Sequence, residues 1–109
     1  MKALHQAIAE LARQGYLVIV DHIFYDEQWL ENCKKAWKDF PVIWVHLVVS
    51  LEELLKREGE RKKIGEHTKE HLQYCVRRLH KNMPKSLEID TSKVSPKEAA
   101  ELILQELKR

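Results

Sequence analysis

The chain has 109 residues, of which 33% are charged and 44% are hydrophobic, and its formal net charge is +2. This length allows one domain with a modest core, and this composition is typical of a globular protein. The small net charge gives no indication of nucleic-acid binding, and no apolar run approaches the roughly 20 residues that cross a bilayer.

The first part of the chain predicts a helix, a strand and a second helix. Apolar residues recur at helical spacing over residues 3–12, and Gly15 follows where that helix would end. Residues 16–20 are an unbroken apolar run that ends at Asp21, as in a parallel strand covered on both faces. Asp26 can cap the second helix, which extends to about Trp37.

The middle of the chain predicts a second buried strand over residues 42–49. Ser50 and Glu53 then have the spacing of a capping box, which opens a third helix through about Arg57. A charged stretch follows, and helical spacing returns over residues 72–79. Cys33 and Cys75 both fall in helical patterns and not in a spaced disulfide framework, which predicts reduced thiols and a cytoplasmic location.

A third strand is predicted over residues 87–90, and Ser95 with Glu98 forms a second capping box before the last helix. Helices therefore alternate with strands along most of the chain. This order predicts an α/β fold of three layers, in which a three-stranded, mostly parallel sheet lies between helices. Residues 1–109 would form a single domain.

Four stretches of the chain occur in a characteristic order. They are residues 15–24, which contain Asp21-His22; residues 42–48 with the helix that begins after Ser50; Arg57 with Arg61; and residues 87–92 followed by Ser95-Pro96. In this order they resemble the C-terminal part of the chloramphenicol phosphotransferase-like family of P-loop kinases. The resemblance covers nearly the whole chain, with residues 57–71 in the place of the lid.

Two features of that family are missing from these residues. None of Gly15, Gly59 and Gly65 begins a G-x-x-x-x-G-K-[ST] phosphate-binding loop, and the family's Arg-Gly-Asp-Arg lid run is replaced by residues 61–65, RKKIG. In the family the P-loop strand lies between the strands that correspond to residues 16–21 and 42–48. Without it, we expect these two strands to pair directly. We also expect the chain to self-associate through a vacant sheet edge, or to fold only marginally.

The resemblance implies ATP-dependent transfer of a phosphoryl group to the hydroxyl of a small-molecule alcohol, with Mg²⁺ as the metal. Asp21 would bind the metal, and Arg57 and Arg61, one helical turn apart, would contact the transferring phosphate. The rim around the adenine would consist of Asp90, Thr91 and Ser92. Because the P-loop is absent, we expect neither ATP nor Mg²⁺ to bind tightly to this chain alone, which would then need a P-loop segment from elsewhere.

Other interpretations remain open. The chain could be a non-enzymatic α/β interaction module, and each candidate residue also fits a solvated helix face or a polar turn. His67 and His71 match the H-x-x-E-H zinc pattern, but no third ligand is evident, so we expect no tight zinc site there. His22 and His46 are predicted to be packed within the fold, and Cys33 to lie on an apolar helix face.

Overall fold

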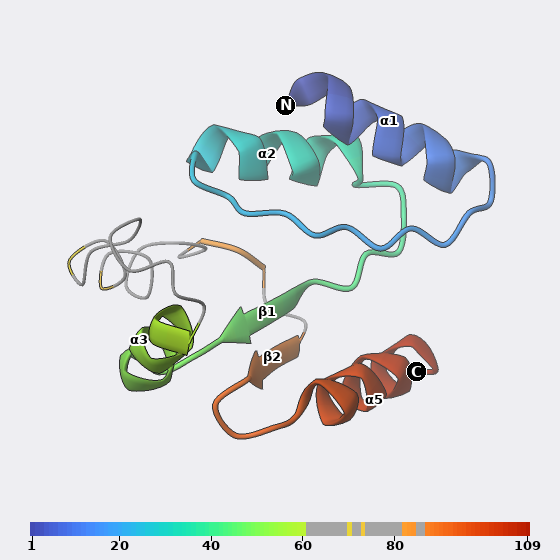
Figure 1. The fold of residues 1–109 in the computed structure, drawn as a ribbon. Helices are drawn as coiled ribbons and strands as arrows, with labels where there is room; N and C mark the ends of the chain where they lie inside the picture. Colours follow the sequence, from blue (N-terminus) through green and yellow to red (C-terminus); the bar gives the residue numbers. More distant parts are fainter. Residues whose placement is uncertain (61–69, 71–72, 74–81, 85–86) are drawn as a thin grey trace. The chain divides into compact units, whose positions relative to one another are not determined.

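The computed structural model describes residues 1–60, 70, 73, 82–84 and 87–109, and the chain divides into two compact units, Met1–Val42 and Ile43–Arg109. The first unit contains the helices α1 (Lys2–Arg13) and α2 (Glu27–Ala36). The second contains β1 (Val45–Val48), α3 (Leu51–Glu60), β2 (Leu87–Asp90) and α5 (Pro96–Leu107) (Figure 1). No helix in these described ranges has both the length and the apolar character that crossing a membrane requires.

Short-range signals determine where the two helices of the first unit end and begin. Gly15 adopts a φ of 95°, a left-handed conformation that glycine reaches without steric cost. Its N–H donates to the carbonyl of Ala12 at 3.0 Å, and the chain leaves α1 at this point, as the sequence predicts. The Asp26 side chain accepts a hydrogen bond of 2.8 Å from the N–H of Gln28, which confirms the predicted cap of α2.

The core of the Met1–Val42 unit forms where α1 packs against α2. Its buried side chains are Ala9, Phe24, Leu30, Cys33, Trp37 and His5. The indole Nε1 of Trp37 donates a buried hydrogen bond of 2.9 Å to the backbone carbonyl of His5. This bond satisfies the polar atom of a large buried ring and fixes the end of α2 to the first turns of α1.

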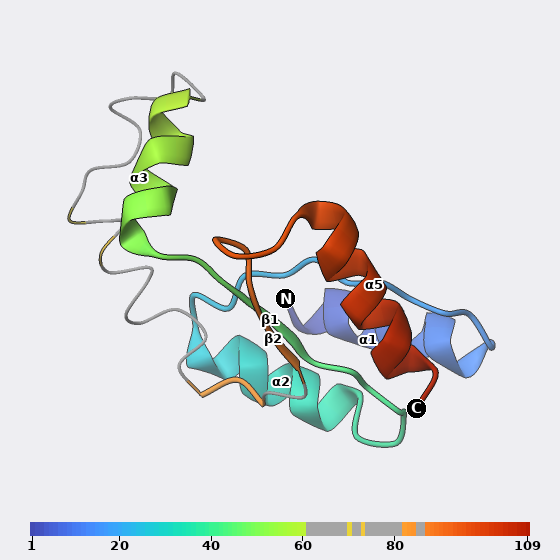
Figure 2. The same cartoon turned by 90° about the horizontal axis from the view of Figure 1, so that it is seen from below.

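In the Ile43–Arg109 unit, β1 and β2 pair in parallel, with Val45 opposite Leu87 and Val48 opposite Asp90. Ile89 in β2 is only 1% exposed and is the most deeply buried apolar residue of this unit among those described. α5 packs beside β2 (Figure 2). It begins at the predicted capping box, in which the Ser95 hydroxyl accepts from the Glu98 N–H and the Glu98 carboxylate accepts from the Ser95 N–H.

The mixed α/β class is confirmed, but the sheet in the described residues has two strands and not three. Residues 16–21 form no strand: they run as an extended connection in which Leu17 is 76% exposed and Ile19 is 92% exposed. An apolar strand is buried on both faces only where neighbouring strands pair with its backbone and helices cover it. No such pairing forms for this segment within the described chain, so the expected three-layer fold is not seen.

The middle of the chain differs from the sequence-based prediction in the length of one strand, and part of it cannot be compared. The predicted strand over residues 42–49 is shortened to β1, Val45–Val48. The predicted helix over residues 72–79 and most of the lid-like segment 57–71 lie outside the described residues.

Candidate functional site

The carboxyl ends of β1 and β2 meet at one edge of the two-stranded sheet, and the loops that leave them are joined by hydrogen bonds. The Thr91 N–H donates to the carbonyl of Val48 at 2.8 Å, which carries the parallel ladder one step past the end of β2. The Ser50 N–H donates to the hydroxyl of Ser92 at 2.9 Å. Ligand sites of open α/β sheets lie at this edge, beyond the carboxyl ends of parallel strands.

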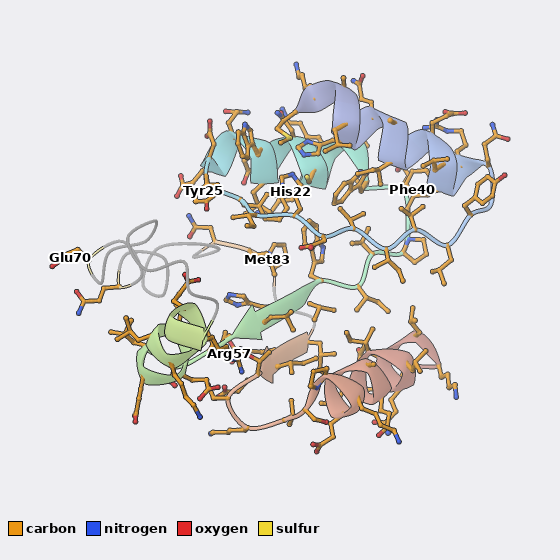
Figure 3. The ribbon with its side chains drawn as sticks, viewed as in Figure 1. His22, Tyr25, Phe40, Arg57, Glu70 and Met83 are labelled. Carbon is orange, nitrogen blue, oxygen red and sulfur yellow. The ribbon has the colours of Figure 1, made fainter. Side chains whose placement is uncertain are left out.

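Arg57 connects α3 to this edge (Figure 3). One terminal nitrogen of its guanidinium donates to the Thr91 hydroxyl at 3.1 Å, and the other donates to the Thr91 carbonyl at 2.7 Å. The Nε–H donates to the Glu53 carboxylate, one turn earlier in α3, at 3.2 Å. The planar guanidinium thus places a positive charge directly beside the loop that follows β2.

The loop after β2 uses its polar groups to hold its own shape. The Asp90 carboxylate accepts from the N–H of Ser92 at 2.8 Å, which is the bond of an Asx turn. The Thr91 hydroxyl donates to the carbonyl of Val48 at 3.1 Å. These bonds give the three residues fixed positions at the edge of the sheet.

The structure therefore brings together four of the six residues that the sequence singled out. Arg57 lies against Thr91, and Asp90 and Ser92 flank Thr91 in the chain. The direct contact between Arg57 and the loop was not predicted, because the two lie 34 residues apart and no local spacing connects them. Whether these residues bind a nucleotide or a phosphate stays a prediction.

The other two predicted site residues are placed differently. Asp21 belongs to the Met1–Val42 unit, where it is exposed at the end of the extended segment. Arg61 lies outside the described residues, as do His67 and His71 of the H-x-x-E-H pattern. The proposed metal and lid roles of these residues therefore stay predictions.

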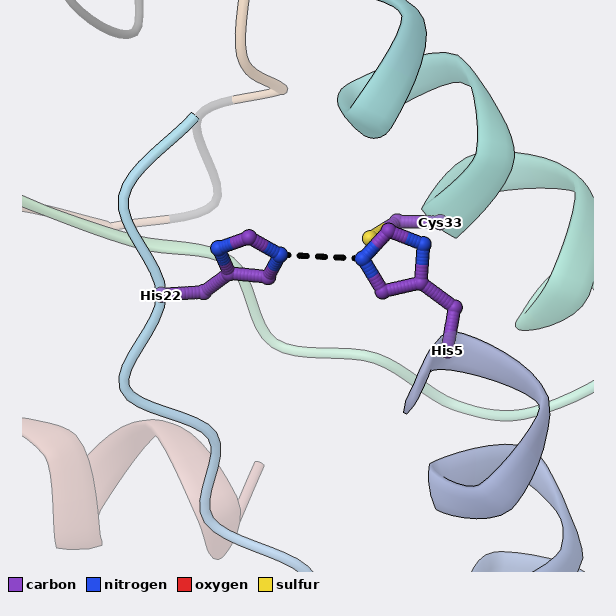
Figure 4. Close-up of side chains that lie close together, drawn as sticks. All are labelled: His5, His22 and Cys33. Atoms are coloured by element: carbon purple, nitrogen blue, oxygen red, sulfur yellow. Dashed lines mark hydrogen bonds between the residues drawn. The ribbon is translucent and has the colours of Figure 1, made fainter. Parts of the chain in front are cut away.

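A second group of chemically active side chains lies in the core of the Met1–Val42 unit. The Nε2 atoms of His5 and His22 are 2.9 Å apart, and the ligand atoms of His5, His22 and Cys33 all lie within 4.8 Å of one another (Figure 4). The sequence indicated packed roles for His22 and Cys33 individually. It gave no signal for the cluster, because its members come from three segments that only the fold brings together.

Burial shapes the chemistry of this cluster. Desolvation lowers the pKa of His5, and the nearby His22 lowers it further. Desolvation raises the pKa of the Cys33 thiol to about 11. The thiol is consequently protonated and unreactive as a nucleophile at neutral pH.

A groove of about 560 Å³ lies beside the cluster, between α1 and α2. Most of the residues that line it are of charged or polar types, and they are Lys2, His5, Gln6, Ala9, Glu10, Arg13, Asn32, Lys35 and Ala36. Small-molecule pockets are usually lined by apolar and aromatic side chains, so this surface has little of their character.

Three comparisons with known proteins bear on the family to which the chain belongs. A search of curated proteins and a search of solved structures each found no match. A family model described as chloramphenicol phosphotransferase-like protein matches residues 1–108, essentially the whole chain. The chain therefore belongs to the chloramphenicol phosphotransferase-like family.

Proposed function

We propose that the chain forms the C-terminal part of a small-molecule kinase, whose parent reaction transfers the γ-phosphoryl group of ATP to a hydroxyl of an alcohol. Family membership supports this class of reaction. The observation that carries the proposal is the position of Arg57, whose guanidinium is bonded to Thr91 at the carboxyl ends of β1 and β2. Phosphoryl transfer depends on such positioned positive charge, because negative charge is spread over the transferring oxygens.

The acceptor hydroxyl would attack the γ-phosphorus and lose its proton to solvent, while the bond to the bridging oxygen breaks and ADP leaves. Arg57 would turn part of its guanidinium from Thr91 toward the phosphate, while the bond to Glu53 keeps the side chain oriented. Arg61 would add a second positive charge from the lid. The adenine would lie against the loop formed by Asp90, Thr91 and Ser92.

The proposed metal is Mg²⁺, with Asp21 as its protein ligand. The Asp21 carboxylate is exposed and accepts no hydrogen bond within the described part of the chain, so its oxygens are available to a hydrated cation. Mg²⁺ is usually held by one or two carboxylates together with substrate phosphates. A single exposed carboxylate fits that pattern only when a nucleotide supplies the remaining ligands.

The P-loop would come from outside these 109 residues, either from more of the same polypeptide or from a second one. We propose that its strand pairs with residues 16–21, which then become the third strand that this chain contributes to the sheet of a three-layer, P-loop-like fold. Two properties of this segment support the proposal. Its residues are apolar, as in a strand that is buried on both faces, yet the side chain of Ile19 is 92% exposed.

The buried free thiol of Cys33 supports a cytoplasmic setting.

We expect the 109-residue chain alone to show no calorimetric binding of MgATP at micromolar concentrations and no phosphorylation of alcohol acceptors. The reason is the missing P-loop, whose backbone N–H groups and lysine supply most contacts to the phosphates. Titration of the chain with MgATP measures this, with Arg57→Ala as a matched variant. Low-micromolar binding that Arg57→Ala abolishes would contradict the predicted inactivity and identify an unconventional phosphate site at this edge.

A second candidate function is a non-enzymatic module that associates with another copy of itself. The exposed apolar residues of the extended segment favour it, because an unpaired strand can add to the edge of another sheet. We expect the sedimentation coefficient to rise with concentration, and Ile19→Asp to suppress this rise. Leu104→Asp, at an exposed position of α5, should leave it unchanged.

A chain that stays monomeric at every concentration, and that unfolds sharply above about 65 °C, would overturn the self-association proposal. Such behaviour would mean that the exposed segment neither recruits a partner nor limits the stability of the chain.

A further inference from the structure

Three side chains with metal-binding atoms converge from three segments of the Met1–Val42 unit. His5 comes from α1, His22 from the extended connection and Cys33 from α2 (Figure 4). His5 is 1% exposed, Cys33 is 0% exposed and His22 is half-buried. Both imidazoles make aromatic contacts: His5 meets Trp37 edge-on with ring centroids 5.8 Å apart, and His22 stacks on Phe24 at 4.3 Å. Burying their ring nitrogens still costs free energy unless those nitrogens find partners.

The hydrogen bonds of His22 direct one of its nitrogens toward the cluster. Its Nδ1 lies 3.1 Å from the carbonyl oxygen of Ile23, and a carbonyl can only accept, so Nδ1 carries the proton. The Nε2 atom of His22 then presents its lone pair to His5. Histidines that bind metals commonly donate their other N–H to a backbone carbonyl in this way, which fixes both the tautomer and the orientation of the ring.

In the His5 ring, only one of the two nitrogens has a hydrogen-bond partner among the described residues. Its Nε2 contacts His22, but its Nδ1 is buried without a hydrogen-bond partner among the described residues. A buried polar atom in this state costs about 1–3 kcal/mol. Coordination of an ion at Nε2 would leave this Nδ1 without a partner, so the observation that points to an ion is the convergence of the three ligand atoms within 4.8 Å of one another.

We propose that His5, His22 and Cys33 bind a transition-metal ion of the zinc class through two imidazole nitrogens and one thiolate sulfur. This donor set suits borderline-soft ions such as Zn²⁺ and Co²⁺. Zn–N bonds of about 2.0–2.1 Å at tetrahedral angles separate two nitrogens by about 3.3 Å. The Nε2 atoms are now 2.9 Å apart, so an ion would replace the shared proton once these two nitrogens separate by a few tenths of an ångström, with the Cys33 sulfur starting within 4.8 Å of them.

The chemistry of each donor is compatible with an ion. Imidazole nitrogens coordinate through their lone pairs, and the Cys33 thiol would lose its proton to solvent as the ion binds. Only these three residues form the cluster in the described part of the chain. Three protein ligands leave a fourth position for water, which can reach the site beside the half-buried His22.

The test uses the full 109-residue chain, purified without a histidine tag and freed of metal. Titration with Co²⁺ should give one equivalent bound per chain, with a thiolate-to-cobalt charge-transfer band in the near-ultraviolet. Zn²⁺ should displace the cobalt and raise the melting temperature. Cys33→Ser should remove the band, and His22→Gln should weaken cobalt binding at least tenfold.

Matched variants separate this cluster from His46, from the pair His67 and His71, and from the other cysteine. Cys75→Ser, His46→Gln and the pair His67→Ala with His71→Ala should each keep the band and the affinity. Absence of a band in the unmodified chain would overturn the proposal, as would a band that survives Cys33→Ser or disappears with Cys75→Ser. If Cys33→Ser does not fold, the half-buried His22→Gln decides the outcome, and unchanged affinity in that variant refutes the site.

Discussion

Replacing Trp37 with alanine is expected to destabilise the Met1–Val42 unit by about 3–5 kcal/mol, the usual cost of removing a buried aromatic side chain. Trp37 is 8% exposed, and its indole N–H bonds to the carbonyl of His5, so the change opens a cavity and also frees α2 from α1. The total stability of a domain is only about 5–15 kcal/mol, so this loss would be a large share of it. Amide exchange in α1 and α2, with far-UV circular dichroism in denaturant, measures the effect.

Trp37→Phe is the matched control. It keeps an aromatic ring in the core and removes the indole N–H, so it separates packing from the hydrogen bond. We expect Trp37→Phe to lower the stability of the Met1–Val42 unit clearly less than Trp37→Ala does. Protection of the α1 amides that is the same in Trp37→Ala as in the unmodified chain would show that α1 is held by other contacts and that this account of the unit is wrong.

In the Ile43–Arg109 unit, Ile89→Ala is expected to lower the free energy of unfolding by about 2–5 kcal/mol. Ile89 is 1% exposed at the centre of β2, and truncating it leaves a cavity beside the parallel pair of strands. Amide exchange in β1 and β2, and chemical denaturation of the chain, provide the measurement. A loss below about 1 kcal/mol would show that this residue does not hold the core of the Ile43–Arg109 unit.

The same substitution at Ile19 is the control, because Ile19 is 92% exposed. Surface substitutions usually change stability by less than about 0.5 kcal/mol, and we expect Ile19→Ala to fall within that range. A large loss at Ile19 would mean that residues 16–21 are packed in solution and would restore the expected buried strand.

The sequence predicted those parts of the fold that depend on neighbours within one turn of helix. Gly15 ends α1, Asp26 caps α2 and the Ser95 capping box opens α5, because each signal is satisfied by backbone groups at most three residues away. The Ser50 hydroxyl likewise accepts from the Glu53 N–H at 3.2 Å at the start of α3. These local bonds do not depend on the rest of the sheet.

Features that depend on distant partners were not predictable in the same way. The apolar run over residues 16–20 has the composition of a buried strand, but composition does not supply the neighbour that a strand must pair with. The contact of Arg57 with Thr91 and the meeting of His5 with His22 both join residues far apart in the chain. Their spacing in the sequence has no helical or strand period, so only the folded chain reveals them.

The extended segment after Gly15 also bears on how long the protein survives in a cell. Peptide-binding proteins that add a strand to a sheet take up extended backbone with accessible N–H and C=O groups. Residues 17–21 already have that form, with Leu17 and Ile19 exposed, and no backbone hydrogen bond ties them to the rest of the described chain. A peptidase or chaperone that binds extended apolar segments would therefore bind residues 17–21 without any prior unfolding of the chain. The rate at which a partner covers this segment, rather than the unfolding rate of either unit, would then set the lifetime of the chain.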